Sequence, residues 1–141
     1  MPATFDKKSL TAEMANAMIQ KAVAKAEEMG HAFAIAVVDE SGVLKAFTRM
    51  DGSPLLANQV AQDKAYTAIG FGIATDQWHD FIKDDAPLAN GAVGGIDRLI
   101  VFGGGYPIQI DGATVGGIGV SGGHYSQDMD VAKAGLDAVA G

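Results

Sequence analysis

The sequence predicts an α/β protein of the profilin-like kind, in which helices flank a mainly antiparallel five-stranded sheet. Two stretches alternate apolar with other residues around tight turns, as β-hairpins do. Stretches with helical apolar spacing precede, separate and follow these hairpins. The 141 residues include no cysteine, and a chain of this length buries a core without disulfides, so we expect one domain over residues 1–141.

The first third of the chain predicts a helix followed by a hairpin. Methionine and alanine recur at helical spacing over residues 9–30, with Ser9 or Thr11 as the N-cap and Gly30 as the C-terminal stop. Residues 33–49 then alternate on both sides of the turn "DESG". These two elements are expected to pack against each other, because both have an apolar side.

Two helices are expected in the middle of the chain. Ser53 and the proline after it form a typical N-cap and first turn, so we expect a helix over residues 54–69. Thr75 is expected to cap a short third helix that runs through Phe81 to the acidic turn "KDDAP". The residues after that turn are rich in glycine and are expected to form a loop.

The last third of the chain predicts three strands and a helix. "RLIVFGG" is expected to be a strand, and "GGYPIQIDGATVGGIGVSGG" a hairpin that turns at Asp111 and Gly112. Ser126 is expected to cap the final helix. Four small strand residues would let a helix approach the sheet closely: Ala34, Ala36, Gly117 and Gly119.

Composition excludes several classes of function. Seventeen acidic residues against ten basic ones give a net charge of −7, which argues against binding to nucleic acid or to an anionic membrane. No apolar stretch is long enough to span a bilayer, and the N-terminus lacks the apolar core of a signal peptide. We therefore expect a cytoplasmic protein.

The motif "SGGHYSQD" is the strongest candidate for a ligand site. The backbone N–H groups of Gly122 and Gly123, just before a helix, could form an anion-binding concavity. His124 could donate a hydrogen bond, move a proton or ligate iron, and Tyr125 stands beside it. The alternative is a plain strand-to-helix turn, with His124 facing solvent or a neighbouring subunit.

The motif "TRMDG" offers a possible carboxylate clamp. Arg49 at a strand end can bind a carboxylate through two hydrogen bonds. Alternatively it forms an ion pair with Asp51 or Asp63. We expect Arg49 and His124 to lie in one concave site. Lys64, on the second helix, is more readily explained as an ion-paired or interface residue than as a nucleophile.

Two further residues are candidates for ligand contact. His79, in "TDQWHDFIKDD", could serve as an axial ligand of haem iron; the alternative is a surface helix with its aromatic side packed inward. Tyr106 follows the glycines of "FGGGYPI" and could line a pocket. That run lacks the residues of a P-loop and the spacing of a dinucleotide-binding motif.

Several blocks of the chain resemble the GlcG/HbpS-like family: "VVDESGVLKAFTRMDGSPL", "AQDKAYTAIGFG", "LIVFGGGYPI" and "VGGIGVSGGHYSQDMDVAKAGL". That family includes glycolate-utilisation GlcG-type proteins, haem-binding HbpS-type proteins and the C-terminal domain of PduO-type proteins. The resemblance spans residues 10–139. It implies a mixed α/β subunit that assembles into dimers and then tetramers or octamers, and a ligand that is haem or a small anionic organic molecule.

Three functional hypotheses follow. The first is haem binding, with His124 or His79 on the iron. The second is an enzyme of a catabolic pathway that acts on a small carboxylic acid as a tautomerase, hydratase or hydrolase. There Arg49 would clamp the carboxylate, and His124 or Asp63 would transfer protons. The third is a non-catalytic, oligomeric accessory protein.

Overall fold

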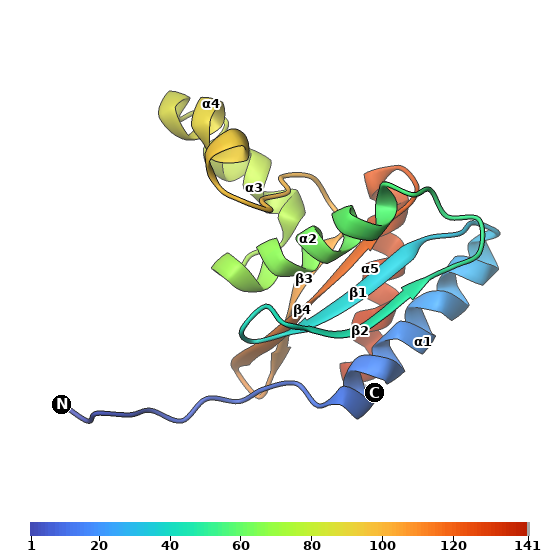
Figure 1. Cartoon of the computed structure of the whole chain (residues 1–141), viewed down its shortest axis with the longest axis horizontal. Coiled ribbons are helices and arrows are strands. Elements are labelled where there is room, and N and C mark those ends of the chain that lie inside the picture. Colours follow the sequence, from blue (N-terminus) through green and yellow to red (C-terminus); the bar gives the residue numbers. More distant parts are fainter. Residues whose placement is uncertain (141) are drawn as a thin grey trace.

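The structure, a computed structural model, describes residues 1–140 and contains five helices and four strands in that range (Figure 1). In chain order they are α1 (Ala12–Met29), β1 (Ala34–Asp39), β2 (Leu44–Arg49), α2 (Ala57–Phe71), α3 (Thr75–Ile82), α4 (Ala86–Gly95), β3 (Gly105–Ile110), β4 (Ala113–Ser121) and α5 (Tyr125–Ala140). The predicted α/β class, with helices flanking an antiparallel sheet, is confirmed.

The sheet has four strands within the described residues, in the order β2-β1-β4-β3, and every neighbouring pair is antiparallel. The predicted fifth strand, at residues 98–104, is wrong. Leu99 in that segment packs with Trp78 and other apolar residues of α3 and α4 instead of lying in the sheet. The backbone of the segment reaches β4 through the hydrogen bond from the Val120 N–H to the Gly104 carbonyl (2.9 Å). Tertiary packing thus overrides its strand-like composition.

The glycine-rich loop predicted before this segment is also wrong, because residues 86–95 form helix α4. The Asp85 side chain caps α4 by accepting a hydrogen bond from the Leu88 N–H (3.2 Å), and Pro87 lies in the first turn. An aspartate N-cap with proline directly inside the helix is a standard start signal. These two residues outweigh the three glycines that follow.

The sheet separates two layers of helices. In Figure 1, α1 and α5 cover one face and α2 covers the other. Ile35 and Val37 of β1 belong to the core cluster formed with α1 and α5. The alternate residues Ala34, Ala36 and Val38 pack against Ala57, Ala61 and Ala65 of α2. This alternation is the period of two that a central strand presents to two covering layers.

Close contact between α2 and the sheet depends on two glycines of β4. A Cβ at Gly117 would collide with the Ala65 carbonyl oxygen, and a Cβ at Gly119 with that of Ala61. Both obstacles are helix backbone, which cannot move aside as a flexible side chain can. The predicted role of the small strand residues is therefore confirmed.

The predicted helix ends are confirmed at α1 and wrong at three other places. Thr11 caps α1, and Gly30 ends it in the left-handed conformation (φ 69°). The second helix begins at Ala57 rather than at residue 54. Thr75 does not cap α3, because it lies inside the helix and its hydroxyl accepts a hydrogen bond from the Gly105 N–H (2.9 Å). Ser126 also lies inside its helix, α5.

Both hairpin turns are confirmed. The Asp39 carboxylate accepts hydrogen bonds from the Ser41 and Val43 N–H groups (2.8 and 3.1 Å) in the first turn. Asp111 and Gly112 both have positive φ (51° and 80°) in the second. Positive φ at both central residues is characteristic of the type I′ turn favoured in two-residue hairpins.

Replacing Gly119 with alanine tests the contact between α2 and the sheet. Because the added methyl would push α2 off the sheet, we expect Gly119→Ala to lower the free energy of unfolding by about 1–3 kcal/mol, as overpacked cores do. Gly94→Ala is the matched control, since nothing lies within 4 Å of a Cβ there; it should leave stability unchanged or raise it slightly. Urea denaturation of both variants measures the difference, and equal midpoints would contradict the role assigned to Gly119.

Candidate functional site

A buried ion pair joins α2 to α5 at one end of β4. The Lys64 Nζ donates to Asp128 Oδ2 (2.8 Å) and to the Val120 carbonyl (3.0 Å). The side chain of Lys64 is 0% exposed and that of Asp128 is 3% exposed. The second carboxylate oxygen, Oδ1, accepts from the Gly123 N–H (3.1 Å). Lys64 is therefore paired, as expected.

Burial is the main influence on both charges of this pair. It lowers the pKa of Lys64 from its usual value and raises the pKa of Asp128, while the attraction between the two groups opposes each shift. Hydrogen bonds to the Gly123 N–H and the Val120 carbonyl satisfy further polar groups of the pair. A buried pair needs such additional hydrogen bonds to offset the loss of hydration.

The motif "SGGHYSQD" is built around Asp128 and His124. Because Asp128 accepts from the Gly123 N–H, that group is occupied by the protein's own carboxylate. His124 Nδ1 accepts from the Ser126 N–H (3.2 Å) and lies 2.9 Å from the Ser126 hydroxyl. The Gln127 side chain accepts from the His124 N–H in return (3.0 Å). His124 therefore acts as the N-cap that was expected of Ser126.

The other side of the same turn is held by His31. Its Nε2 lies 3.0 Å from the Gly122 carbonyl, and its ring packs edge-on against Phe33 (4.8 Å between centroids). The His124 ring packs against the Tyr125 ring at a tilt of 37°, with centroids 4.1 Å apart. These contacts give Gly122, His124 and Tyr125 a fixed arrangement in which Tyr125 remains exposed.

Arg49 and Asp63 belong to different networks. Arg49 Nη2 donates to the Ser53 carbonyl (2.9 Å), and within residues 1–140 Arg49 forms no ion pair. Asp63 pairs with Arg98 (2.8 Å), whose guanidinium lies 3.9 Å from the Tyr66 ring centroid. The alternative pairing of Arg49 with Asp63 is thus not what the structure shows.

Arg49 and His124 lie at the same end of the sheet without sharing the Arg49 cavity. Ala34 of β1 pairs with Arg49 on one side and with Ser121, three residues before His124, on the other. The cavity beside Arg49 is lined by Val23, Glu27, Thr48, Met50 and Asp51, together with Arg49 itself. His124 is not among these residues, so Arg49 and His124 do not line this cavity together.

His79 and Tyr125 do share a cavity, of about 330 Å³, between α3 and the start of α5. Its lining residues are Asp76, His79, Asp80, Val101, Phe102, Gly103 and Tyr125. The His79 ring has no hydrogen-bond partner among the described residues, so its nitrogens are available to a ligand. Phe102 also joins this cavity to the buried pair, since Lys64 Nζ lies 5.0 Å from its ring centroid.

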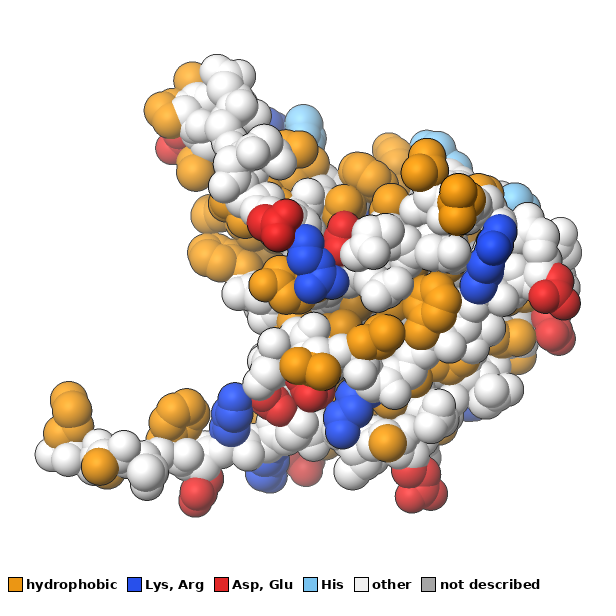
Figure 2. Space-filling view, in the orientation of Figure 1, with side chains coloured by type: hydrophobic (Ala, Val, Ile, Leu, Met, Phe, Trp, Pro, Cys, Tyr) orange, Lys and Arg blue, Asp and Glu red, His pale blue; other side chains and the backbone are white. Residues whose placement is uncertain are grey.

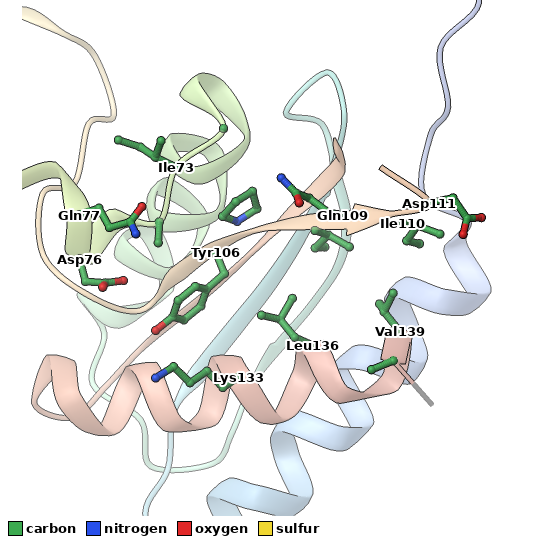
Figure 3. A pocket seen from close by; sticks show the side chains of 15 residues that line it. Ile73, Asp76, Gln77, Tyr106, Gln109, Ile110, Asp111, Lys133, Leu136 and Val139 are labelled. Carbon is green, nitrogen blue, oxygen red and sulfur yellow. The ribbon is translucent and has the colours of Figure 1, made fainter. Parts of the chain in front are cut away.

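Tyr106 lines a larger cavity of about 640 Å³ between β3, α5 and the segment from Gly72 to Gln77 (Figure 3). Leu136 and Val139 of α5 form part of its apolar wall. In Figure 3, Asp76, Tyr106 and Lys133 lie toward one end of the cavity, and Ile110 and Val139 toward the other. Asp76 belongs to this cavity and to the His79 cavity.

Sequence reasoning missed Phe102, Asp76 and Lys133 as cavity residues. Phe102 fell in the segment "RLIVFGG", which was expected to be a strand. Asp76 was difficult to identify as a cavity residue from the sequence, because a carboxylate in the first turn of a helix usually only complements the helix dipole. Among the described residues no cluster of acidic and histidine side chains has metal-site geometry, and no helix there is long and apolar enough to cross a membrane.

Comparisons with known proteins find relatives over most of the chain. A family model described as "Haem degrading protein HbpS-like" matches residues 10–137. Corrinoid adenosyltransferase PduO of Citrobacter freundii is 31% identical over 131 residues, which cover 93% of this chain but only 39% of PduO. This chain therefore spans well under half of that relative.

Two solved structures have the same fold over nearly the whole chain. The protein ORFY of Klebsiella pneumoniae has a TM-score of 0.93 at 27% identity, covering 99% of this chain and 97% of ORFY. A PduOC:heme complex has a TM-score of 0.86 at 30% identity, covering 93% of this chain and 95% of PduOC.

Removing one partner of the buried pair should be far more harmful than removing both. Lys64→Met leaves the Asp128 carboxylate buried without its cation, so we expect a loss of about 3–5 kcal/mol in the free energy of unfolding. The double variant Lys64→Met/Asp128→Leu removes the unpaired charge and should recover much of that loss. Chemical denaturation of both single variants and the double variant measures the coupling. Additive losses would show that the two charges do not stabilise each other.

Proposed function

The chain belongs to the HbpS-like family, and from this premise we propose that it binds haem, with His79 as the iron ligand. The observation that carries the assignment to His79 is its cavity. An imidazole that has no hydrogen-bond partner within residues 1–140 lies in the same cavity as two aromatic side chains, Phe102 and Tyr125. The family description refers to haem, and the PduOC:heme complex is a relative of the same fold. Both support haem as the ligand.

The residues around this cavity suit a porphyrin. A neutral imidazole is a common axial ligand of haem iron. The exposed rings of Phe102 and Tyr125 offer apolar surface against which a porphyrin can stack. Lys83, paired with Asp80 at 3.2 Å and 48% exposed, can pair with a propionate. Bound haem would supply an iron centre for redox or oxygen chemistry, while these residues would hold and orient it.

His124 is the weaker candidate for the iron. Its Nδ1 accepts a hydrogen bond from the Ser126 N–H, and its ring packs against the Tyr125 ring. The cap gives His124 a structural role that His79 lacks. We therefore assign His124 to support of Tyr125 at the edge of the cavity.

The enzyme acting on a small carboxylic acid is the second candidate, and one observation favours it. The Arg49 guanidinium is exposed and is held by the Ser53 carbonyl rather than by a carboxylate. Its weakness is the missing proton-transfer partner, because Asp63 is engaged by Arg98 and His124 does not line the Arg49 cavity. A non-catalytic accessory role is the third candidate.

We also propose a homo-oligomer that begins with a dimer. In Figure 1, α3 and α4 project from the body of the subunit, and Figure 2 shows hydrophobic side chains on this projection and on the adjoining end of α2. The exposed apolar residues there are Phe71, Phe81, Leu88, Val93 and Ile96. An exposed apolar patch of this kind is typical of a protein–protein interface.

A haemin titration followed by absorbance tests the proposed function. We expect a saturable Soret shift in the unaltered protein and in His124→Ala, and a lost or displaced Soret band in His79→Ala, because only that variant removes the iron ligand. His124→Ala is the matched control, since it removes an imidazole next to the same cavity. An unchanged band in His79→Ala would refute His79 as the ligand, and no saturable shift in any form would refute haem binding.

Light scattering tests the oligomer. We expect Val93→Asp, which places a charge on the exposed apolar side of α4, to lower the molar mass in solution without reducing helix content. Asn90→Asp is the control, because it introduces the same charge at an exposed polar position of α4. A monomeric unaltered protein, or equal masses for both variants, would contradict an interface on this projection.

A further inference from the structure

Two polar atoms of residues that line the cavity between β3 and α5 have no hydrogen-bond partner within residues 1–140. The Tyr106 hydroxyl and Asp76 Oδ1 are both buried and make no hydrogen bond within the described residues. A buried polar atom without a partner costs about 1–3 kcal/mol. Native proteins rarely retain such atoms without a reason, and here two residues on different elements line one cavity.

The polar groups at this end of the cavity come from three elements: Asp76 from α3, Tyr106 from β3 and Lys133 from α5. Figure 3 shows the Tyr106 hydroxyl between the Asp76 carboxylate and the Lys133 amino group. The Lys133 Nζ lies 6.0 Å from the centroid of the Tyr106 ring, and Lys133 forms no ion pair among the described residues. The polar end of the cavity thus combines a hydroxyl, a carboxylate and an unpaired ammonium group.

Tyr106 is suited to donate a hydrogen bond rather than to accept a proton. Burial is the main cause that raises its pKa to about 12, and the negative charges of Asp76 and Asp130 add to it. The phenol is therefore protonated at neutral pH. Asp76 lies in the first turn of α3, where the positive end of the helix dipole favours a carboxylate that accepts hydrogen bonds.

The rest of the cavity combines the polar side chains of Gln77, Gln109 and Asp111 with a continuous set of apolar ones. Ile73, Pro107, Ile108 and Ile110 line it from the α2–α3 connection and β3, and Leu136 and Val139 from α5. Its volume of about 640 Å³ lies in the range of small-molecule sites, which combine apolar walls with a few placed polar groups. A fitting ligand has one polar head and an apolar body.

We propose that this cavity binds a small, uncharged, amphipathic alcohol. Its hydroxyl would accept a hydrogen bond from Tyr106 and donate one to Asp76, while its hydrocarbon part would lie against Leu136 and Val139. A carboxylate head would face the charge of Asp76, and an ammonium head the charge of Lys133, whereas a hydroxyl both donates and accepts. This site goes beyond haem binding, with which it shares only Asp76.

Three probes with one scaffold and different heads test the proposal: benzyl alcohol, benzoate and benzylamine. Their binding to the full chain is followed by amide chemical shifts in NMR. Benzyl alcohol should bind saturably and most tightly, with the largest shifts in β3 and α5. Tyr106→Phe and Asp76→Ala should each weaken it roughly five- to tenfold, as expected for one lost hydrogen bond. Tyr66→Phe, outside the cavity, should leave its affinity unchanged.

Stability and haemin measurements complete the test. Because the Tyr106 hydroxyl makes no hydrogen bond to the part of the chain that the structure describes, Tyr106→Phe should unfold at the same or a higher temperature. It should also keep its haemin response, and His79→Ala should keep its response to benzyl alcohol, which separates this proposal from the haem proposal. Tighter binding of either charged probe, equal affinity in Tyr106→Phe, or no saturable response to the alcohol would overturn the proposal.

Discussion

The buried Lys64–Asp128 pair is the interaction on which the arrangement of the subunit depends. Lys64 comes from the helix on one face of the sheet and Asp128 from the helix on the other, so the pair ties the two layers together around the end of β4. A Cβ at Gly104 would lie 2.7 Å from Lys64 Nζ, which explains why glycine occupies that position. The turn before α5 also depends on this pair, because Asp128 accepts a hydrogen bond from the Gly123 N–H.

Such a pair is possible only because α2 lies unusually close to the sheet. Gly117 and Gly119 remove the side chains that would separate helix and strand, and Ala61 and Ala65 provide a flat helix surface opposite them. The closeness lets the Lys64 side chain reach the Val120 carbonyl and Asp128 while remaining fully buried. The glycine-rich composition is therefore a packing requirement, and it contributes to the site indirectly by fixing where α5 begins.

The regular parts of this fold could be predicted from sequence because their signals are local. Thr11 and Gly30 delimit α1, and Asp111 with Gly112 defines a hairpin turn whichever residues surround it. The strand predicted from Arg98 to Gly104 was wrong because apolar residues of this segment pack against α3 and α4. The local sequence pattern does not reveal such long-range contacts. The prediction that Ser126 caps α5 was also wrong. His124 caps the helix instead, and histidine is not among the usual capping residues.

The candidate site was only partly predictable, since its residues meet through tertiary structure. His79, Tyr106 and Tyr125 were identified from residue type and position near glycines or helix starts, and each proves to line a cavity. Their partners in those cavities, Phe102, Asp76 and Lys133, come from segments that sequence alone could not bring together. Arg49 and Asp63 show the converse, because each fits a catalytic role by residue type but is held in a separate network.

Asp76 gives the two cavities a physical connection. It lines both of them, and Gly103, which lines the His79 cavity, packs between the side chains of Asp76 and Met129. An alcohol that donates to Asp76 from the Tyr106 side would disperse its negative charge, and a less negative carboxylate beside His79 would favour an anionic ligand such as haem. If both proposed ligands bind, Asp76 would couple the two sites, and the coupling would be reciprocal, because each ligand would change the affinity for the other by the same factor.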